Sequence, residues 1–205
     1  MRLFLAVPIP PDIAAAAFAL LPPPVPALRR VRPELMHLTL AFLGDTPEAL
    51  LPQVIAAAQA AGAGQSTFEV VLDQAGRFPA DGVPRVIWLG VGEGRARLQG
   101  LADRVVTALR ERTLRFEQRP IQPHLTLARI PGGTPVPEAR AIAAAVAALR
   151  LRPLVVPVQR IAVVESVLAG RGPRYTERGE AGLSGGGTRT AVEGSGPRSA
   201  RRGRR

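Results

Sequence analysis

The chain contains no cysteine, so it can form neither disulfide bonds nor a thiolate nucleophile, as is typical of a cytoplasmic protein. It has only two histidines. A zinc site usually takes three or four histidine, cysteine or carboxylate ligands, so no metal or other cofactor is expected. Prolines and Asp12 interrupt the apolar N-terminal stretch, and no apolar run is long enough to span a membrane. We therefore expect a cytoplasmic protein.

Lysine is also missing, since all 27 basic residues are arginine. Abundant alanine, glycine and proline accompany the arginine, a composition typical of a GC-rich genome, so the arginine content alone says little about function. The formal net charge of +11 nevertheless attracts polyanions. A length of 205 residues with 46% hydrophobic content is compatible with one domain or two small lobes around an ample core.

One tetrapeptide occurs twice. The sequence His-Leu-Thr-Leu occupies residues 37–40 and again residues 124–127, and alanine follows each copy. Both histidines of the chain open this motif. A chance match at the three positions after each histidine is on the order of one in a few thousand. The repeat therefore predicts two equivalent functional segments.

Each copy has the pattern of a β-strand, because alternate side chains of a strand face opposite sides. His37 and Thr39 would share a polar face, as would His124 and Thr126, while the leucines pack into the core. Two imidazoles on either side of a phosphate can act as base and acid in an in-line displacement. The threonine hydroxyls can donate hydrogen bonds to its oxygens.

A single histidine–threonine pair on a strand is more often structural than catalytic, because buried polar groups need partners. The duplication reverses that preference. A non-catalytic alternative remains open, in which a basic RNA-binding module uses the same strands to bind phosphate without turnover.

The paired motifs resemble those of the 2H phosphoesterases, and more narrowly of the RNA 2′,3′-cyclic phosphodiesterases, also called 2′-5′ RNA ligases. The resemblance covers residues 1–176. It extends to the strand at 2–7, to Phe78-Pro79 and 84–90, and to 166–168 with Gly172, Pro173 and Tyr175.

The resemblance implies hydrolysis of RNA 2′,3′-cyclic phosphate termini to 2′-phosphomonoesters, without a metal. By position, His37 would be the proton donor and His124 the acceptor, although identical motifs do not separate these roles. Thr39 and Thr126 would hold the phosphate oxygens. Arg129 also matches a family position near the phosphate, but strand alternation turns it away from His124 unless the strand bends or ends.

The partner implied is RNA with 2′,3′-cyclic phosphate ends, tRNA fragments included, and the protein is expected to act as a monomer. Formation of 2′-5′ linkages is the reverse chemistry in the same site and is the first alternative. A 3′-5′ exonuclease is another.

The two halves of the chain repeat one plan, in which a motif strand is followed by a helix. Together with the resemblance, this predicts an α+β, bilobal fold: two antiparallel-sheet lobes with helices outside and pseudo-twofold symmetry around a central cleft. Helices are expected at 11–20, 46–61, 96–111 and 137–149. Strands are expected at 2–7, 37–43, 67–72, 85–91, from 124, at 154–158 and at 161–167.

Two further segments are rich in arginine. Residues 177–205 are rich in glycine, serine and arginine, and are expected to form a disordered tail beyond a folded domain of residues 1–176. This tail is either a non-specific RNA tether or an extension without a role. Arg29, Arg30 and Arg32 precede the first motif and belong either to a solvated loop or to a phosphate-contacting surface.

Overall fold

The computed structural model describes residues 1–21, 27–119, 121–148, 151–170 and 172–183. Its strands are β1 (Arg2–Pro8), β2 (Arg29–Arg30), β3 (His37–Asp45), β4 (Phe68–Phe78), β5 (Val86–Val91), β6 (His124–Arg129), β7 (Leu154–Val158), β8 (Arg160–Ala169) and β9 (Gly172–Gly182). Its α-helices are α1 (Pro11–Ala19), α2 (Leu51–Gly62), α3 (Arg95–Glu111) and α4 (Val136–Ala147), and 3-10 turns occupy Pro33–Leu35 and Glu48–Leu50. None of the described helices has the length and apolar character that crossing a membrane requires.

All the described strands form a single sheet, in the order β7-β4-β5-β6-β3-β1-β8-β9, with β2 paired to β6. Every pairing is antiparallel. The two halves of the sheet meet where Leu38 of β3 lies opposite Leu125 of β6, a junction we call the seam. Outward from the seam, β3, β1, β8 and β9 correspond in order to β6, β5, β4 and β7. The predicted α+β fold with pseudo-twofold symmetry is confirmed, and its two antiparallel halves are joined edge to edge in one sheet.

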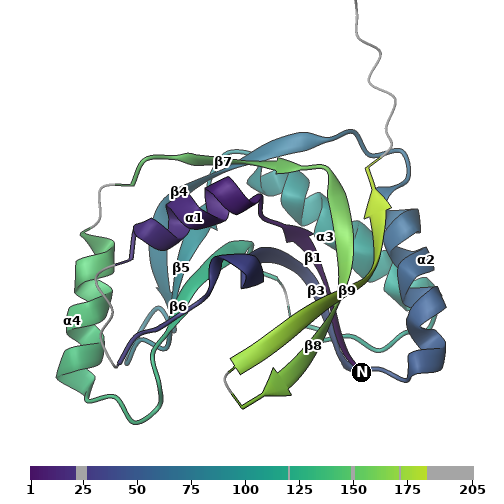
Figure 1. Ribbon diagram of the computed structural model, residues 1–205. Helices are drawn as coiled ribbons and strands as arrows, with labels where there is room; N and C mark the ends of the chain where they lie inside the picture. The colour runs from purple at the N-terminus through teal and green to yellow at the C-terminus, as the bar shows by residue number, and fades with distance from the viewer. Residues whose placement is uncertain (22–26, 120, 149–150, 171, 184–205) are drawn as a thin grey trace, which may run out of the picture.

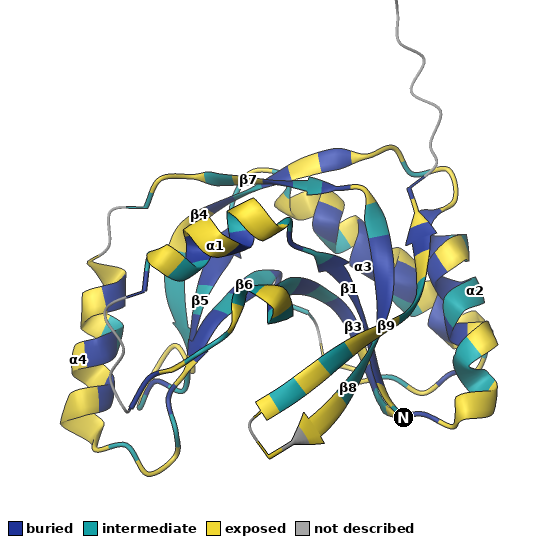
Figure 2. Cartoon of the chain, in the orientation of Figure 1, coloured by how far each residue is buried: buried dark blue, intermediate teal, exposed yellow. Residues whose placement is uncertain are grey.

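The helices pack on this sheet by apolar stripes. The stripe of α3 that its spacing predicted, Leu98, Leu101, Val105 and Leu109, is buried. Helix α3 packs against α2 and contacts both β3 and β4, so it touches both halves of the sheet. Figure 1 shows α4 at the opposite end of the molecule from α2. Figure 2 shows that α1 and α4 are mostly exposed, with buried residues confined to part of each helix.

Each predicted element is present, but strands β2 and β9 were not predicted, and two predicted elements differ in length. Helix α2 begins at Leu51 rather than near residue 46, because a 3-10 turn occupies Glu48–Leu50 and Pro52 suits the first turn of an α-helix. Strand β4 continues to Phe78 rather than ending at 72, because its ladder with β5 extends that far.

The folded part also continues beyond the predicted boundary at residue 176. Strand β9 runs to Gly182 and pairs with β8 over its whole length. The Arg160 guanidinium lies 2.6 Å from the Glu177 carboxylate and 2.8 Å from that of Glu180. The prediction that the tail begins at residue 177 is therefore wrong for residues 177–183. Residues 184–205 lie outside the described part of the chain, and their disorder stays a prediction.

Candidate active site

The polar side chains of both motifs gather at the seam. The motif leucines are fully buried, whereas His37, Thr39, His124 and Thr126 are half-buried on the opposite face of their strands. The charge of His124 contributes to lowering the pKa of His37, which places the two imidazoles within electrostatic reach of each other. The structure thus brings together the four residues that the duplicated motif predicted.

Each imidazole is held by a backbone carbonyl two residues before it. His37 Nδ1 lies 2.7 Å from the Leu35 carbonyl oxygen, and His124 Nδ1 lies 2.6 Å from that of Gln122. A carbonyl oxygen only accepts hydrogen bonds, so Nδ1 must carry the hydrogen in both rings. This leaves Nε2 of each ring to accept or donate a proton.

Aromatic rings enclose both imidazoles, although aromatic residues make up only 4% of the chain. Around His37, the Phe4 and Tyr175 ring centroids lie at 4.7 and 5.5 Å. Around His124, the centroids of Phe78 and Trp88 lie at 5.0 and 6.1 Å. The motif analysis did not predict these contacts. The available signal was that Phe78, Trp88 and Tyr175 all fall in segments that resemble the family.

A glycine allows Trp88 to reach across the sheet. Gly76 of β4 lies opposite Trp88 of β5 in the ladder. A Cβ atom at Gly76 would stand 2.2 Å from Cη2 of the indole, so any larger residue would displace the ring. The backbone of β4 thus positions the indole beside His124.

Burial and positive charge lower the pKa of both histidines. The pKa of His37 falls from 6.5 to about 4, chiefly because burial penalises the charged ring. The hydrogen bond to the Leu35 carbonyl opposes this change, whereas the charges of His124 and Arg129 add to it. Burial is also the main cause that lowers the pKa of His124, again with a contribution from Arg129. An anion bound at this site would favour the charged form of both rings.

A β-bulge determines where Arg129 points. The register of β6 against β5 shifts between Thr126 and Ala128, which leaves Leu127 as an extra residue. Strict alternation would have turned Arg129 away from the motif histidines. The bulge returns its exposed side chain to their face, and its charge contributes to lowering the pKa of both rings. Strand β6 therefore continues its pairing with β5 as far as Arg129, and the bulge alone turns Arg129 toward the site.

The first motif strand carries the equivalent bulge. The register of β3 against β1 shifts between Thr39 and Ala41, which leaves Leu40 as the extra residue. Phe42 consequently occupies the position that Arg129 has in the second motif, and it is 44% exposed. The two halves of the site are alike up to this residue and differ there, one ending in an aromatic ring and the other in a cation.

The arginines that precede the first motif have different surroundings. The Arg30 guanidinium stacks 3.8 Å from the centroid of the Phe18 ring and donates a hydrogen bond to the Phe18 carbonyl. Arg30 thus fastens α1 to the sheet, and the phosphate-contact interpretation does not apply to it. Arg32 pairs with Glu34 at 3.3 Å in an exposed position.

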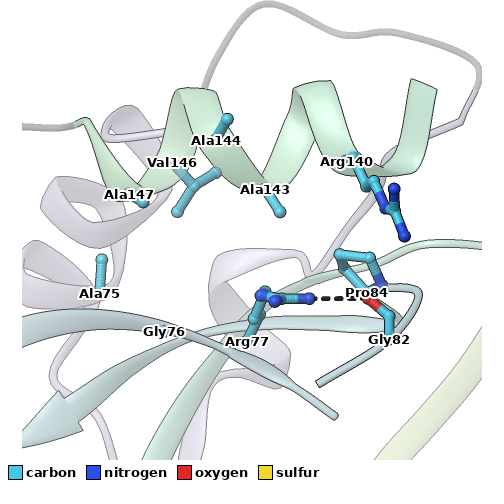
Figure 3. Close-up of a pocket in the computed structure, with 10 residues that line it drawn as sticks. All are labelled: Ala75, Gly76, Arg77, Gly82, Pro84, Arg140, Ala143, Ala144, Val146 and Ala147. Atoms are coloured by element: carbon cyan, nitrogen blue, oxygen red, sulfur yellow. Dashed lines mark hydrogen bonds between the residues drawn. The ribbon is translucent and has the colours of Figure 1, made fainter. Parts of the chain in front are cut away.

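Two hollows of the surface differ in their distance from the histidines. One of about 200 Å³ lies beside His37 and is lined in part by Phe4, Tyr175 and Glu177. A larger cavity of about 540 Å³ lies between α4 and β4, away from both histidines, and Figure 3 shows Arg140 and Arg77 on opposite sides of it. Of the predicted site residues, only His37 lines the smaller hollow, and neither histidine lines the larger one. The described residues include no cluster of three or more metal-ligating His, Asp or Glu side chains.

Comparison with known proteins finds similarity to one family and to relatives that share one name. Residues 11–169 match the family model of the 2′-5′ RNA ligase superfamily. A Thermus thermophilus protein named RNA 2′,3′-cyclic phosphodiesterase is 34% identical over 205 residues, which cover 97% of this chain and 98% of that protein. One of the same name from Aeropyrum pernix is 33% identical over 152 residues, covering 72% of this chain and 82% of its own.

The fold is likewise similar to solved structures. Protein TT0787 of Thermus thermophilus superposes with a TM-score of 0.71 at 30% identity, covering 89% of this chain and 98% of that one. E. coli LigT in complex with 3′-AMP superposes with a TM-score of 0.68 at 26% identity, with the same coverage.

Proposed function

The chain belongs to the 2′-5′ RNA ligase superfamily, and from that premise we propose that it hydrolyses RNA 2′,3′-cyclic phosphate ends to 2′-phosphomonoesters. The observation that carries the proposal is the pair of imidazoles at the seam. Both have Nδ1 bound to a backbone carbonyl and Nε2 left for proton exchange. Relatives named RNA 2′,3′-cyclic phosphodiesterase support the reaction class.

In the proposed reaction the cyclic phosphate lies between the two rings. His124 Nε2 takes a proton from water, and the resulting oxygen nucleophile attacks phosphorus in line with the bond to the 3′ oxygen. That bond breaks, and the 3′ oxygen receives a proton from His37 Nε2. The product carries a 2′-phosphate and a 3′-hydroxyl. Because the pKa of His37 is lowered in the free protein, the ring must gain its proton from the effect of the bound phosphate before it can act as donor.

Three further side chains complete the proposed site. The hydroxyls of Thr39 and Thr126 stand on the same face as the imidazoles and would donate to the non-bridging phosphate oxygens. Arg129 would pair with the same phosphate, because a guanidinium presents two N–H donors in parallel. Its charge also offsets the second negative charge that develops as water attacks.

Substrate turnover in the presence of EDTA tests the proposal. The protein should convert a nucleoside 2′,3′-cyclic phosphate to the 2′-nucleotide, and chelator should not slow it, because proton transfer by two imidazoles needs no metal. Loss of rate in EDTA that Zn²⁺ or Mg²⁺ restores would contradict the two-histidine mechanism. Tight binding of the cyclic phosphate without turnover would favour the RNA-binding alternative.

The physiological setting is part of the same proposal. The partner is RNA with 2′,3′-cyclic phosphate ends, and the protein acts on it as a monomer in the cytoplasm. Ligation to a 2′-5′ linkage is the reverse of the hydrolytic step, so it would require a 5′-hydroxyl end held in place of water. Size-exclusion chromatography and product analysis with a second RNA end test these two points.

A further inference from the structure

Arg29 stands beside Arg129 on the face of the sheet that bears the histidines. The two-residue strand β2 pairs with β6, and Arg29 lies directly opposite Arg129 in that ladder. Directly opposed residues of an antiparallel pair point to the same face, with Cβ atoms about 5 Å apart. The bulge has already placed Arg129 on the site face. Arg29 therefore lies on that face as well.

The neighbouring residue confirms this orientation. Arg30 lies opposite Ala128, which is fully buried, and its guanidinium packs against Phe18 of α1. Side chains alternate along a strand, so Arg29 must project to the other side. Its exposed position agrees with this.

Two arginines in directly opposed positions repel each other. Among the described residues, neither Arg29 nor Arg129 forms a salt bridge or a side-chain hydrogen bond. Among the other exposed arginines of the described residues, Arg32 pairs with Glu34 and Arg119 with Glu117, whereas some, such as Arg95 and Arg140, also have no such partner. The pair thus forms a concentrated positive surface that an anionic ligand would stabilise.

The two arginines stand on different strands, Arg129 on β6 with His124 and Arg29 on the neighbouring β2. Arg129 contributes to lowering the pKa of both histidines, whereas Arg29 contributes to neither. Arg29 is the outer member of the pair because it lies one strand away from the strand that carries His124. If Arg129 holds the cyclic phosphate, the next negative charge of an RNA end is the phosphate on the 5′ oxygen of the terminal nucleotide.

We propose that Arg29 binds the phosphate on the 5′ side of the terminal nucleotide, so that the site prefers phosphorylated or oligonucleotide ends to free nucleoside cyclic phosphates. This inference rests on the proposed function. It assigns the arginine pair two successive phosphates of one RNA chain, the inner one reactive and the outer one a binding contact.

A pair of substrates that differ by one group tests this inference. Cytidine 2′,3′-cyclic phosphate would be compared with the same compound carrying a 5′-phosphate, by kcat/KM. The wild-type protein should have a kcat/KM ~5–30-fold higher for the substrate with the 5′-phosphate, mainly through a lower KM. This is the effect expected from one partly exposed, charge-assisted hydrogen bond. Arg29→Gln should abolish most of that preference. Arg32→Gln is the matched control and should retain it, since Arg32 already pairs with Glu34.

The outcomes separate this inference from the function it rests on. A wild-type protein that turns over the 5′-hydroxyl substrate but shows no preference would overturn the inference alone. So would an Arg29→Gln variant that keeps the preference, or one that loses activity equally on both substrates, which would mean that Arg29 acts only through Arg129. A wild-type protein inactive on both substrates would overturn the proposed function and the inference together.

Discussion

Phosphate binding should return the proton that His37 needs to act as donor. In the free protein, burial and the nearby charges of His124 and Arg129 hold the pKa of His37 at about 4. Only about one molecule in a thousand then carries the charged ring at pH 7. A phosphate charge ~4 Å from the ring, at the effective dielectric constant of such sites, stabilises the imidazolium by about 4 kcal/mol. This displaces its titration midpoint upward by about 3 pH units, into the neutral range.

NMR titration of the ring protons measures this displacement directly. The chain has only two histidines, so its spectrum contains two sets of imidazole signals, which a His37→Gln variant assigns. Titrations would be recorded for the free protein and with a saturating 2′-nucleotide, the product of the proposed reaction. The His37 signal should titrate near pH 4 in the free protein and in the neutral range in the complex.

Two results would refute this reasoning. If His37 of the free protein titrates at its ordinary value, burial does not control the ring. If its midpoint stays low in the complex, the bound phosphate does not lie beside it, and another group must protonate the leaving oxygen. Arg129→Gln provides an internal check, because removal of this positive charge should raise the pKa of His37 in the free protein.

Other predictions follow from the same structure. His37→Ala and His124→Ala should each lower kcat/KM by ~10²–10⁴-fold with an unchanged circular dichroism spectrum. An aryl phosphodiester, whose leaving group needs no proton, should partly restore the activity of His37→Ala but not of His124→Ala. Equal rescue of both variants would reject the donor and acceptor roles. The free energy of unfolding, measured in urea, should fall by about 3 kcal/mol from pH 6.5 to 4. The reason is that His37 binds a proton in this pH range in the unfolded chain but not in the folded protein. In His37→Gln this decrease in the free energy of unfolding should be smaller. Truncation after Thr176 should lower Tm, since it removes residues 177–182 of β9, most of which pair with β8. Truncation after Leu183 should leave both Tm and mononucleotide turnover unchanged. Equal Tm values for the two truncations would contradict the observed strand boundary.

The site residues that local pattern determines were predictable from the sequence. Alternation along the motif strands places His37 and Thr39 opposite the buried leucines, and it requires no knowledge of the partner strand. The orientation of Arg129 was not predictable in this way, because it depends on a bulge. A bulge is a property of the register between two strands, and that register forms only when β5 and β6 pair.

Long-range packing explains the remaining differences. Phe4 and Tyr175 come from opposite ends of the chain and meet only in the fold, so no local spacing predicts that they enclose His37. Strand β9 was not among the expected strands, because its composition is polar and glycine-rich. Backbone pairing with β8, the ion pairs of Arg160 and Arg178, and packing against α2 with Ala181 buried stabilise it.

The seam also has a mechanical consequence. The sheet is narrowest where Leu38 meets Leu125, so bending of the molecule should concentrate at this pair. Because one imidazole belongs to each side, such a hinge motion would change the separation of the two Nε2 atoms. Segments that cross the junction restrict it: Val31 donates a backbone hydrogen bond to Leu127 of the other half, and α3 contacts both halves. These contacts should therefore help to keep the spacing between the acid and the base nearly constant.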